Sequence, residues 1–147
     1  MTYILTRCKG GEDGKRSFIN PPPWMIDKAI DALRPHTDDE DSFIILRNED
    51  KDEAVYGCWY VQTKDISEDP EKVYLVEARF TRYEYFQHCR AFLQDTDEVK
   101  KIFRMFLKDI DPDVSGWEVV NDKLAALQSS QPQPDAGMGT VYMPDDD

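Results

Sequence analysis

The side chains in this sequence that are best suited to chemistry are three cysteines and two histidines, of which only His88 and Cys89 are adjacent. A cysteine nucleophile needs a general base and a group that orients that base. Cys89 could take either histidine as its base, so a thiol enzyme or hydrolase is one hypothesis. Cys58 and Cys89 alternate with aromatic residues, however, which favours positions in the core. No nucleophile motif surrounds either cysteine, and we therefore predict that the protein is not an enzyme and has no catalytic residue.

The spacing of residues does not support a metal or cofactor site either. A zinc site needs paired Cys or His ligands at short spacing, whereas the cysteines and His36 are widely separated. The segment Asp109-Ile-Asp-Pro-Asp113 resembles the start of a calcium loop, but it lacks the central glycine and the glutamate at loop position twelve. The glycines between Lys9 and Arg16 are not followed by Gly-Lys-Ser/Thr. We predict no metal and no cofactor.

The stretch Val73 to Phe80 is the clearest strand, because bulky residues alternate between its two faces. One face is wholly apolar and is predicted to pack in the core; it consists of Tyr74, Val76, Ala78 and Phe80. The other face mixes apolar and charged side chains; it consists of Val73, Leu75, Glu77 and Arg79. This second face is predicted to meet either solvent or a partner.

The remaining segments predict an α+β domain in which an antiparallel sheet of about five strands packs against two main helices. Strands are expected at residues 2–8, 43–46, 54–63, 73–80 and 82–93, although the last of these also fits a helical stripe. A final short strand is expected at residues 116–120. The helices are expected from an Asn20 N-cap to about Leu33, and from Asp97 to Lys108. Residues 1–127 are predicted to form one domain, followed by a flexible or docked tail at residues 128–147.

The net charge of −12 is concentrated in two parts of the chain. Residues 35–72 carry four basic and twelve acidic side chains, and residues 110–147 carry one basic and eight acidic side chains. Such a chain repels nucleic acid and anionic membranes and attracts a basic protein, although the charge also serves solubility by itself. With no run of 18 apolar residues, no signal peptide and an odd number of cysteines, a cytoplasmic location is expected.

A partner-binding surface is predicted on the outer face of the sheet, where Trp59 and Val61 are expected to lie beside Glu77. Aromatic side chains anchor protein partners, and charged groups steer them. Acidic residues at the end of a strand would add to the steering field; they are Asp50, Asp52 and Glu53. The competing interpretation places Trp59 in the core and covers this face with the C-terminal tail. Neither interpretation decides whether the protein forms a homodimer.

The order of several short motifs resembles the first-numbered immunity-protein family of bacterial polymorphic toxin systems. The likeness covers residues 18–120. Its motifs are the Asn20-Pro-Pro-Pro-Trp-Met-Ile-Asp-Lys-Ala-Ile-Asp-Ala-Leu33 helix, Ser42-Phe-Ile-Ile-Leu46, Tyr74-Leu-Val-Glu77-Ala-Arg, the Thr96-Asp-Glu-Val helix ending in Phe106-Leu107, and Trp117. The triple proline, the segment before Phe18 and the tail after Leu127 depart from the family pattern.

The resemblance implies a small cytoplasmic protein that binds the toxin domain encoded beside it and blocks that toxin. Such toxins often attack nucleic acid, as deaminases or nucleases, and would carry a basic substrate cleft. An acidic inhibitor suits such a cleft. The alternative is a non-catalytic adaptor or assembly protein that uses the same face for another basic protein.

Overall fold

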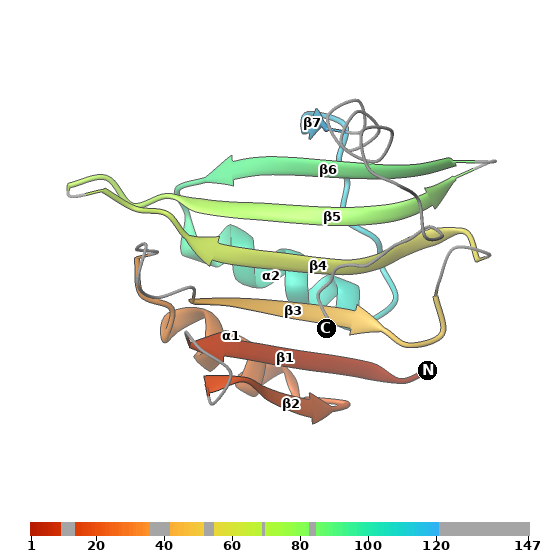
Figure 1. Ribbon diagram of the computed structural model, residues 1–147, viewed down its shortest axis with the longest axis horizontal. Coiled ribbons are helices and arrows are strands. Elements are labelled where there is room, and N and C mark those ends of the chain that lie inside the picture. The colour runs from red at the N-terminus through yellow and green to blue at the C-terminus, as the bar shows by residue number, and fades with distance from the viewer. Residues whose placement is uncertain (10–13, 36–41, 52–54, 69, 83–84, 121–147) are drawn as a thin grey trace, which may run out of the picture.

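The computed structural model describes residues 1–9, 14–35, 42–51, 55–68, 70–82 and 85–120. Within these residues seven strands form one antiparallel sheet in the spatial order β2-β1-β3-β4-β5-β6-β7 (Figure 1). The strands are β1 (Tyr3–Lys9), β2 (Arg16–Ile19), β3 (Ser42–Asn48), β4 (Gly57–Asp65), β5 (Tyr74–Arg82), β6 (Tyr85–Leu93) and β7 (Glu118–Val119). The predicted α+β class is therefore confirmed, although the sheet has seven strands in place of about five.

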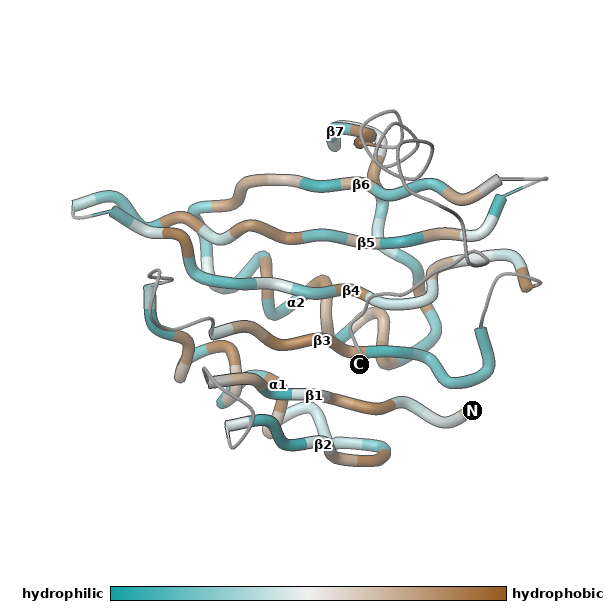
Figure 2. The backbone as a smooth tube through the Cα atoms, in the orientation of Figure 1, coloured by the Kyte–Doolittle hydropathy of each residue, from teal (hydrophilic) through white to brown (hydrophobic). Residues whose placement is uncertain are grey.

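The two helices of the described residues, α1 (Pro23–Asp31) and α2 (Thr96–Leu107), lie on the same side of the sheet (Figure 1). Figure 2 shows apolar residues recurring along the central strands and the helices. Those that turn toward one another make the core, which includes Leu5, Ile26, Ile30, Leu46, Val61, Val76, Phe80, Val99, Phe103 and Phe106. Neither described helix has the length and apolar character needed to span a membrane.

Both ends of α2 are closed by local hydrogen bonds. The Asp95 carboxylate accepts a bond of 2.9 Å from the backbone N–H of Asp97, which caps the first turn. At the other end, the N–H of Ile110 donates to the carbonyl of Met105 at 2.9 Å. This pattern requires a left-handed residue just beyond the helix, and Asp109 supplies it with φ 65°. The helix end therefore sets the direction in which the chain leaves Asp109.

The predicted role of Asn20 as the N-cap of the first helix is wrong. Pro22 occupies the N-cap position and makes no side-chain cap. Asn20 instead binds Tyr3 twice: its side-chain oxygen accepts from the Tyr3 N–H at 2.9 Å, and its own N–H donates to the Tyr3 carbonyl at 2.7 Å. Asn20 thus closes the β1–β2 pair. The sequence does not predict β2, because this strand is short and carries only one clearly apolar pair, Phe18 and Ile19.

A β-bulge in β4 decides which way Trp59 points. Cys58 pairs with Phe80 and Tyr60 pairs with Arg79, so Trp59 is the extra residue between them. Trp59 turns away from the helices toward Thr81 and Arg79, which agrees with the first of the two placements considered for it. Val61 is completely buried on the helix side, however, and the prediction that it shares a face with Trp59 is wrong. The bulge breaks the strict alternation on which that prediction depended.

We call the side of the sheet that faces away from both helices the open face. No helix of the described residues lies on it. Strand pairing places its side chains in rows that cross the sheet, because residues opposite one another in an antiparallel pair share a face. They include Ile4, Thr6, Phe43, Ile45, Arg47, Trp59, Tyr60, Gln62, Lys64, Leu75, Glu77, Arg79, Phe86, His88, Arg90 and Phe92.

Candidate partner-binding surface

Glu77 lies in the middle of the open face, where two neighbouring strands donate hydrogen bonds to it. Nε2 of Gln62 donates to its Oε1 at 2.8 Å, and Nε2 of His88 lies 3.1 Å from its Oε2. Burial raises the pKa of the Glu77 carboxyl, but the bonds from His88 and Gln62 and the charge of Lys64 outweigh burial and leave the pKa below its ordinary value. Glu77 is therefore a fixed carboxylate that links β4, β5 and β6.

Arg79 lies next along β5 on the same face and is held by aromatic rings. Its guanidinium carbon is 4.3 Å from the centroid of the Phe86 ring and 5.4 Å from that of the Trp59 ring. Burial raises the pKa of the Tyr60 hydroxyl, and the charge of Arg79 and its hydrogen bond to that hydroxyl oppose the rise. The predicted anchor Trp59 is thus one part of an ordered aromatic and cationic group rather than an isolated side chain.

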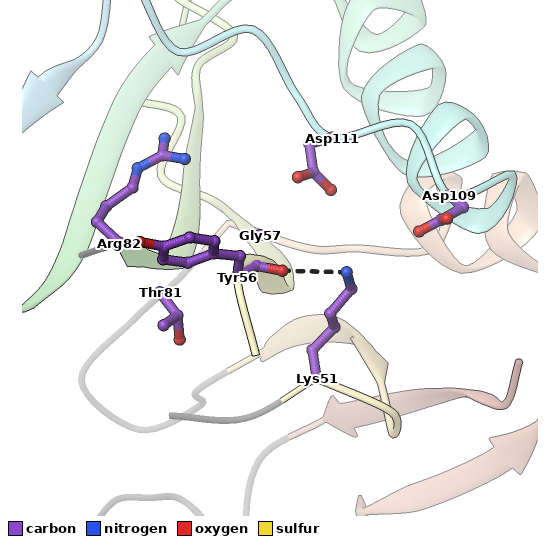
Figure 3. A pocket seen from close by; sticks show the side chains of 7 residues that line it. All are labelled: Lys51, Tyr56, Gly57, Thr81, Arg82, Asp109 and Asp111. Atoms are coloured by element: carbon purple, nitrogen blue, oxygen red, sulfur yellow. Dashed lines mark hydrogen bonds between the residues drawn. The ribbon is translucent and has the colours of Figure 1, made fainter. Parts of the chain in front are cut away.

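Trp59 also connects the open face to a pocket at the end of the sheet. Its indole Nε1 donates to the hydroxyl of Thr81 at 2.8 Å. Thr81 in turn lines a pocket of about 490 Å³ (Figure 3). The lining residues are Lys51, Tyr56, Gly57, Thr81, Arg82, Asp109 and Asp111. Two cations and two carboxylates line this pocket, so it has no preference for a ligand of one sign.

Gly57 allows a cation and a carboxylate to converge on the pocket. Its φ of 112° is a conformation that other residues rarely adopt. A Cβ at this position would lie 3.2 Å from Nζ of Lys51 and 3.3 Å from Oδ2 of Asp111. The backbone fixes both groups, since Nζ of Lys51 donates to the Tyr56 carbonyl at 3.1 Å and Oδ2 of Asp111 accepts from the Cys58 N–H at 3.2 Å. No pattern in the sequence predicts this pocket.

Asp50 lies at this same end of the sheet and not on the open face. Its Oδ2 accepts a hydrogen bond of 3.1 Å from the N–H of Thr2. Burial raises the pKa of the Tyr3 hydroxyl, and the negative charges of Asp109, Asp111 and Asp50 raise it further. We call the part of the sheet where these three carboxylates lie the acidic end; Lys51 and Arg82 of the adjoining pocket offset part of their charge. The other two predicted acidic contacts, at positions 52 and 53, lie outside the described residues.

The strands place more positive than negative charge on the open face. Four cations and two carboxylates of the described strands point to this side; they are Arg47, Lys64, Arg79, Arg90, Glu77 and Glu118. Arg47 and Arg90 form ion pairs with Glu49 and Glu118, at 3.0 Å and 2.7 Å. The acidic steering groups and the aromatic anchor are therefore found on two adjoining surfaces that meet at Thr81.

The adjacent pair His88 and Cys89 does not form a catalytic dyad. Successive residues of a strand point to opposite faces, and here His88 contacts Glu77 on the open face while Cys89 is buried in the core. Burial raises the pKa of the Cys89 thiol, and burial with the nearby charge of Asp111 raises that of Cys58. Neither thiol is activated as a nucleophile. The other histidine, His36, lies outside the described residues.

Among the described residues, no group of three or more His, Cys, Asp and Glu side chains is arranged to hold a metal ion. Comparison with protein-family models, with curated proteins and with solved structures finds no match to the chain.

Proposed function

We propose that this protein is an immunity protein, an antitoxin that binds a cognate bacterial toxin domain and occludes its active site. The observation that carries the proposal is the open face, which displays an ordered group of aromatic and charged side chains away from both helices. In this proposal the protein has no catalytic role and acts in the cytoplasm of the cell that makes the toxin.

The composition of the open face supports a binding role. A sheet face that meets only water is normally polar, because the apolar residues alternate onto the core side. Here large apolar side chains also occupy the open face, among them Phe43, Ile45, Leu75 and Phe92. Phe92 is 55% exposed. Strand pairing sets Lys64 between Phe43 and Leu75, so the apolar side chains of this face alternate with polar ones, as they do in many protein interfaces.

The charge of the molecule supports a basic partner. A net charge of −12 attracts a basic protein at long range and raises its association rate. The acidic end at Asp50, Asp109 and Asp111 adjoins the open face, so a basic cleft steered to that end would arrive beside Trp59. A toxin that acts on nucleic acid, such as a deaminase or a nuclease, carries a cleft of this sign. In the proposed mechanism the carboxylates at the end of the sheet face that cleft, while the open face packs against the neighbouring surface of the toxin and blocks entry to the cleft.

Co-expression with the product of the neighbouring gene tests the proposal. The toxin domain should kill cells that lack this protein, and cells that make both should survive and yield a complex that co-purifies. Survival without co-purification, or co-purification without protection, would contradict the proposal. A neighbouring gene for a structural component whose product binds this protein would instead favour an adaptor.

A further inference from the structure

We infer that Arg79 is the anchor of the open face and that its guanidinium receives a carboxylate of the partner. The inference rests on the proposed function and deepens it, because it assigns one residue and one chemical class of contact to the toxin interface.

Arg79 has a central and rigid position. Strand pairing sets it between Tyr60 on β4 and His88 on β6, so it is flanked by strands on both sides. The rings of Phe86 and Trp59 lie against its guanidinium, at 4.3 Å and 5.4 Å from the central carbon. A guanidinium stacked on aromatic rings has already lost most of its rotational freedom. A partner that binds it therefore incurs a smaller entropic cost than it would with a mobile surface arginine.

Arg79 also lacks an ion pair within the described residues. Arg47 and Arg90, the other two arginines of the open face, each form an ion pair with a glutamate, Glu49 and Glu118. Nε of Arg79 is buried and donates no hydrogen bond in the described chain. Glu77, two residues away on the same face, is already engaged by Gln62 and His88. The positive charge of Arg79 is therefore held in place without a carboxylate to balance it.

The group that fits this position is a carboxylate on a folded protein. The planar fork of a guanidinium matches carboxylate and phosphate equally well. A nucleic acid would bring many phosphates toward a molecule of net charge −12, and that repulsion opposes its approach. A basic toxin domain is attracted as a whole and can still present one Asp or Glu side chain at its surface. Arginine in the centre of an interface, surrounded by aromatic residues, is also a frequent hot spot.

The affinity of the purified toxin domain of the neighbouring gene should be measured for the wild type, Arg79→Gln and Arg79→Lys. Arg79→Gln should weaken binding by about thirty-fold or more, mainly through faster dissociation. The affinity of Arg79→Lys should lie between those of the wild type and Arg79→Gln, because lysine keeps the positive charge but lacks the planar guanidinium that can bind both carboxylate oxygens. Arg34→Gln is the control, and its affinity should stay within about threefold of wild type, since Arg34 is exposed just beyond α1 and lies outside the open face.

A chemical cross-link identifies the bonded group directly. A carbodiimide joins an amine to a carboxylate in contact with it, so the Arg79→Lys protein should become linked through position 79 to an Asp or Glu of the toxin domain. Arg34→Lys, at an exposed position just beyond α1, should give no such link. Mass spectrometry of the digested product locates the linked residues. Near-UV circular dichroism of each variant shows whether the aromatic group around position 79 is intact.

The outcomes separate this inference from the proposed function. Full affinity of Arg79→Gln for a toxin domain that the wild type binds would overturn the inference and leave the function standing. Failure of the wild type to bind the toxin domain would overturn both. Binding of a single-stranded oligonucleotide that is lost in Arg79→Gln would also overturn the inference, because the anchored group would then be a phosphate.

Discussion

Oε2 of Glu77 lies 3.1 Å from Nε2 of His88, across the β5–β6 pair and on the side of the sheet away from the helices. Gln62 holds the other carboxylate oxygen at 2.8 Å. The carboxylate at the centre of the candidate surface therefore belongs to the folded architecture of the sheet before any partner arrives.

This relationship predicts how stability responds to acid. Burial raises the pKa of the Glu77 carboxyl, but hydrogen bonds and nearby positive charge lower it by a larger amount. Glu77 therefore binds a proton less tightly in the folded protein than in the unfolded chain. The stabilisation is therefore complete above the unfolded value of about 4.5 and is lost as the pH falls through the lower, folded value. Glu77→Gln should cost about 1–2 kcal/mol at pH 7 and should flatten the dependence of stability on pH below about 4.5.

Urea unfolding followed from pH 7 down to pH 3 measures both effects. Glu71→Gln is a suitable control, because Glu71 is exposed and outside the open-face group. An unchanged acid slope in Glu77→Gln would contradict the assigned role of the carboxylate.

Two ion pairs of equal length are predicted to differ in their contribution to stability. Nζ of Lys72 lies 2.8 Å from Asp65, whose side chain is completely buried, and Nζ of Lys100 lies 2.8 Å from Asp31, whose side chain is 58% exposed. Lys72→Met leaves a buried carboxylate without its cation and should cost about 1–3 kcal/mol. Lys100→Met should cost no more than about 0.5 kcal/mol. Chemical denaturation of the two variants compares them, and equal losses would contradict the effect of burial.

Asp109 is predicted to be better replaced by glycine than by alanine. It is the left-handed residue that ends α2, with φ 65°, a conformation in which a Cβ is unfavourable. Asp109→Gly should leave stability unchanged or raise it by up to about 1 kcal/mol, whereas Asp109→Ala should lower it by a similar amount. Thermal unfolding of both variants provides the test, and a lower melting temperature for Asp109→Gly than for Asp109→Ala would contradict this geometry.

Asp109→Gly should also slow association with a basic toxin domain and weaken its dependence on salt, because it removes one carboxylate of the acidic end. A stopped-flow measurement at low and high salt would detect the change. An unchanged association rate would show that the acidic end is not part of the interface.

Much of the fold could be predicted because its main elements have strong local patterns. The alternation from Val73 to Phe80 identifies both faces of β5, and Phe80 and Val76 are indeed buried. The capping and apolar stripe of α2 identify that helix almost to the residue. Within the ambiguous segment at residues 82–93, Tyr85–Leu93 forms β6, so the strand and not the helix is correct for these residues. The spacing of apolar residues and the composition are enough to predict these elements, because local sequence determines whether each of them forms a helix or a strand.

The features that were missed depend on contacts between distant residues. Asn20 has the chemistry of an N-cap, but pairing with Tyr3 places it at the end of β2 instead. Val61 was assigned to the wrong face because a single extra residue in β4 reverses the alternation. The side chains around Glu77 and Arg79 come from three strands, and the acidic end combines Asp50 with Asp109. No local pattern in the sequence shows that these residues meet.

The central claim is that the open face binds the toxin, and one pair of substitutions tests it most directly. Phe92 on β6 is 55% exposed on the open face, and Trp24 on α1 is 62% exposed in the helix layer. Affinity for the toxin domain of the neighbouring gene should fall by at least about tenfold in Phe92→Asp and stay within about twofold of wild type in Trp24→Asp. The opposite result, with binding lost in Trp24→Asp and kept in Phe92→Asp, would place the interface on the helix side and contradict the claim.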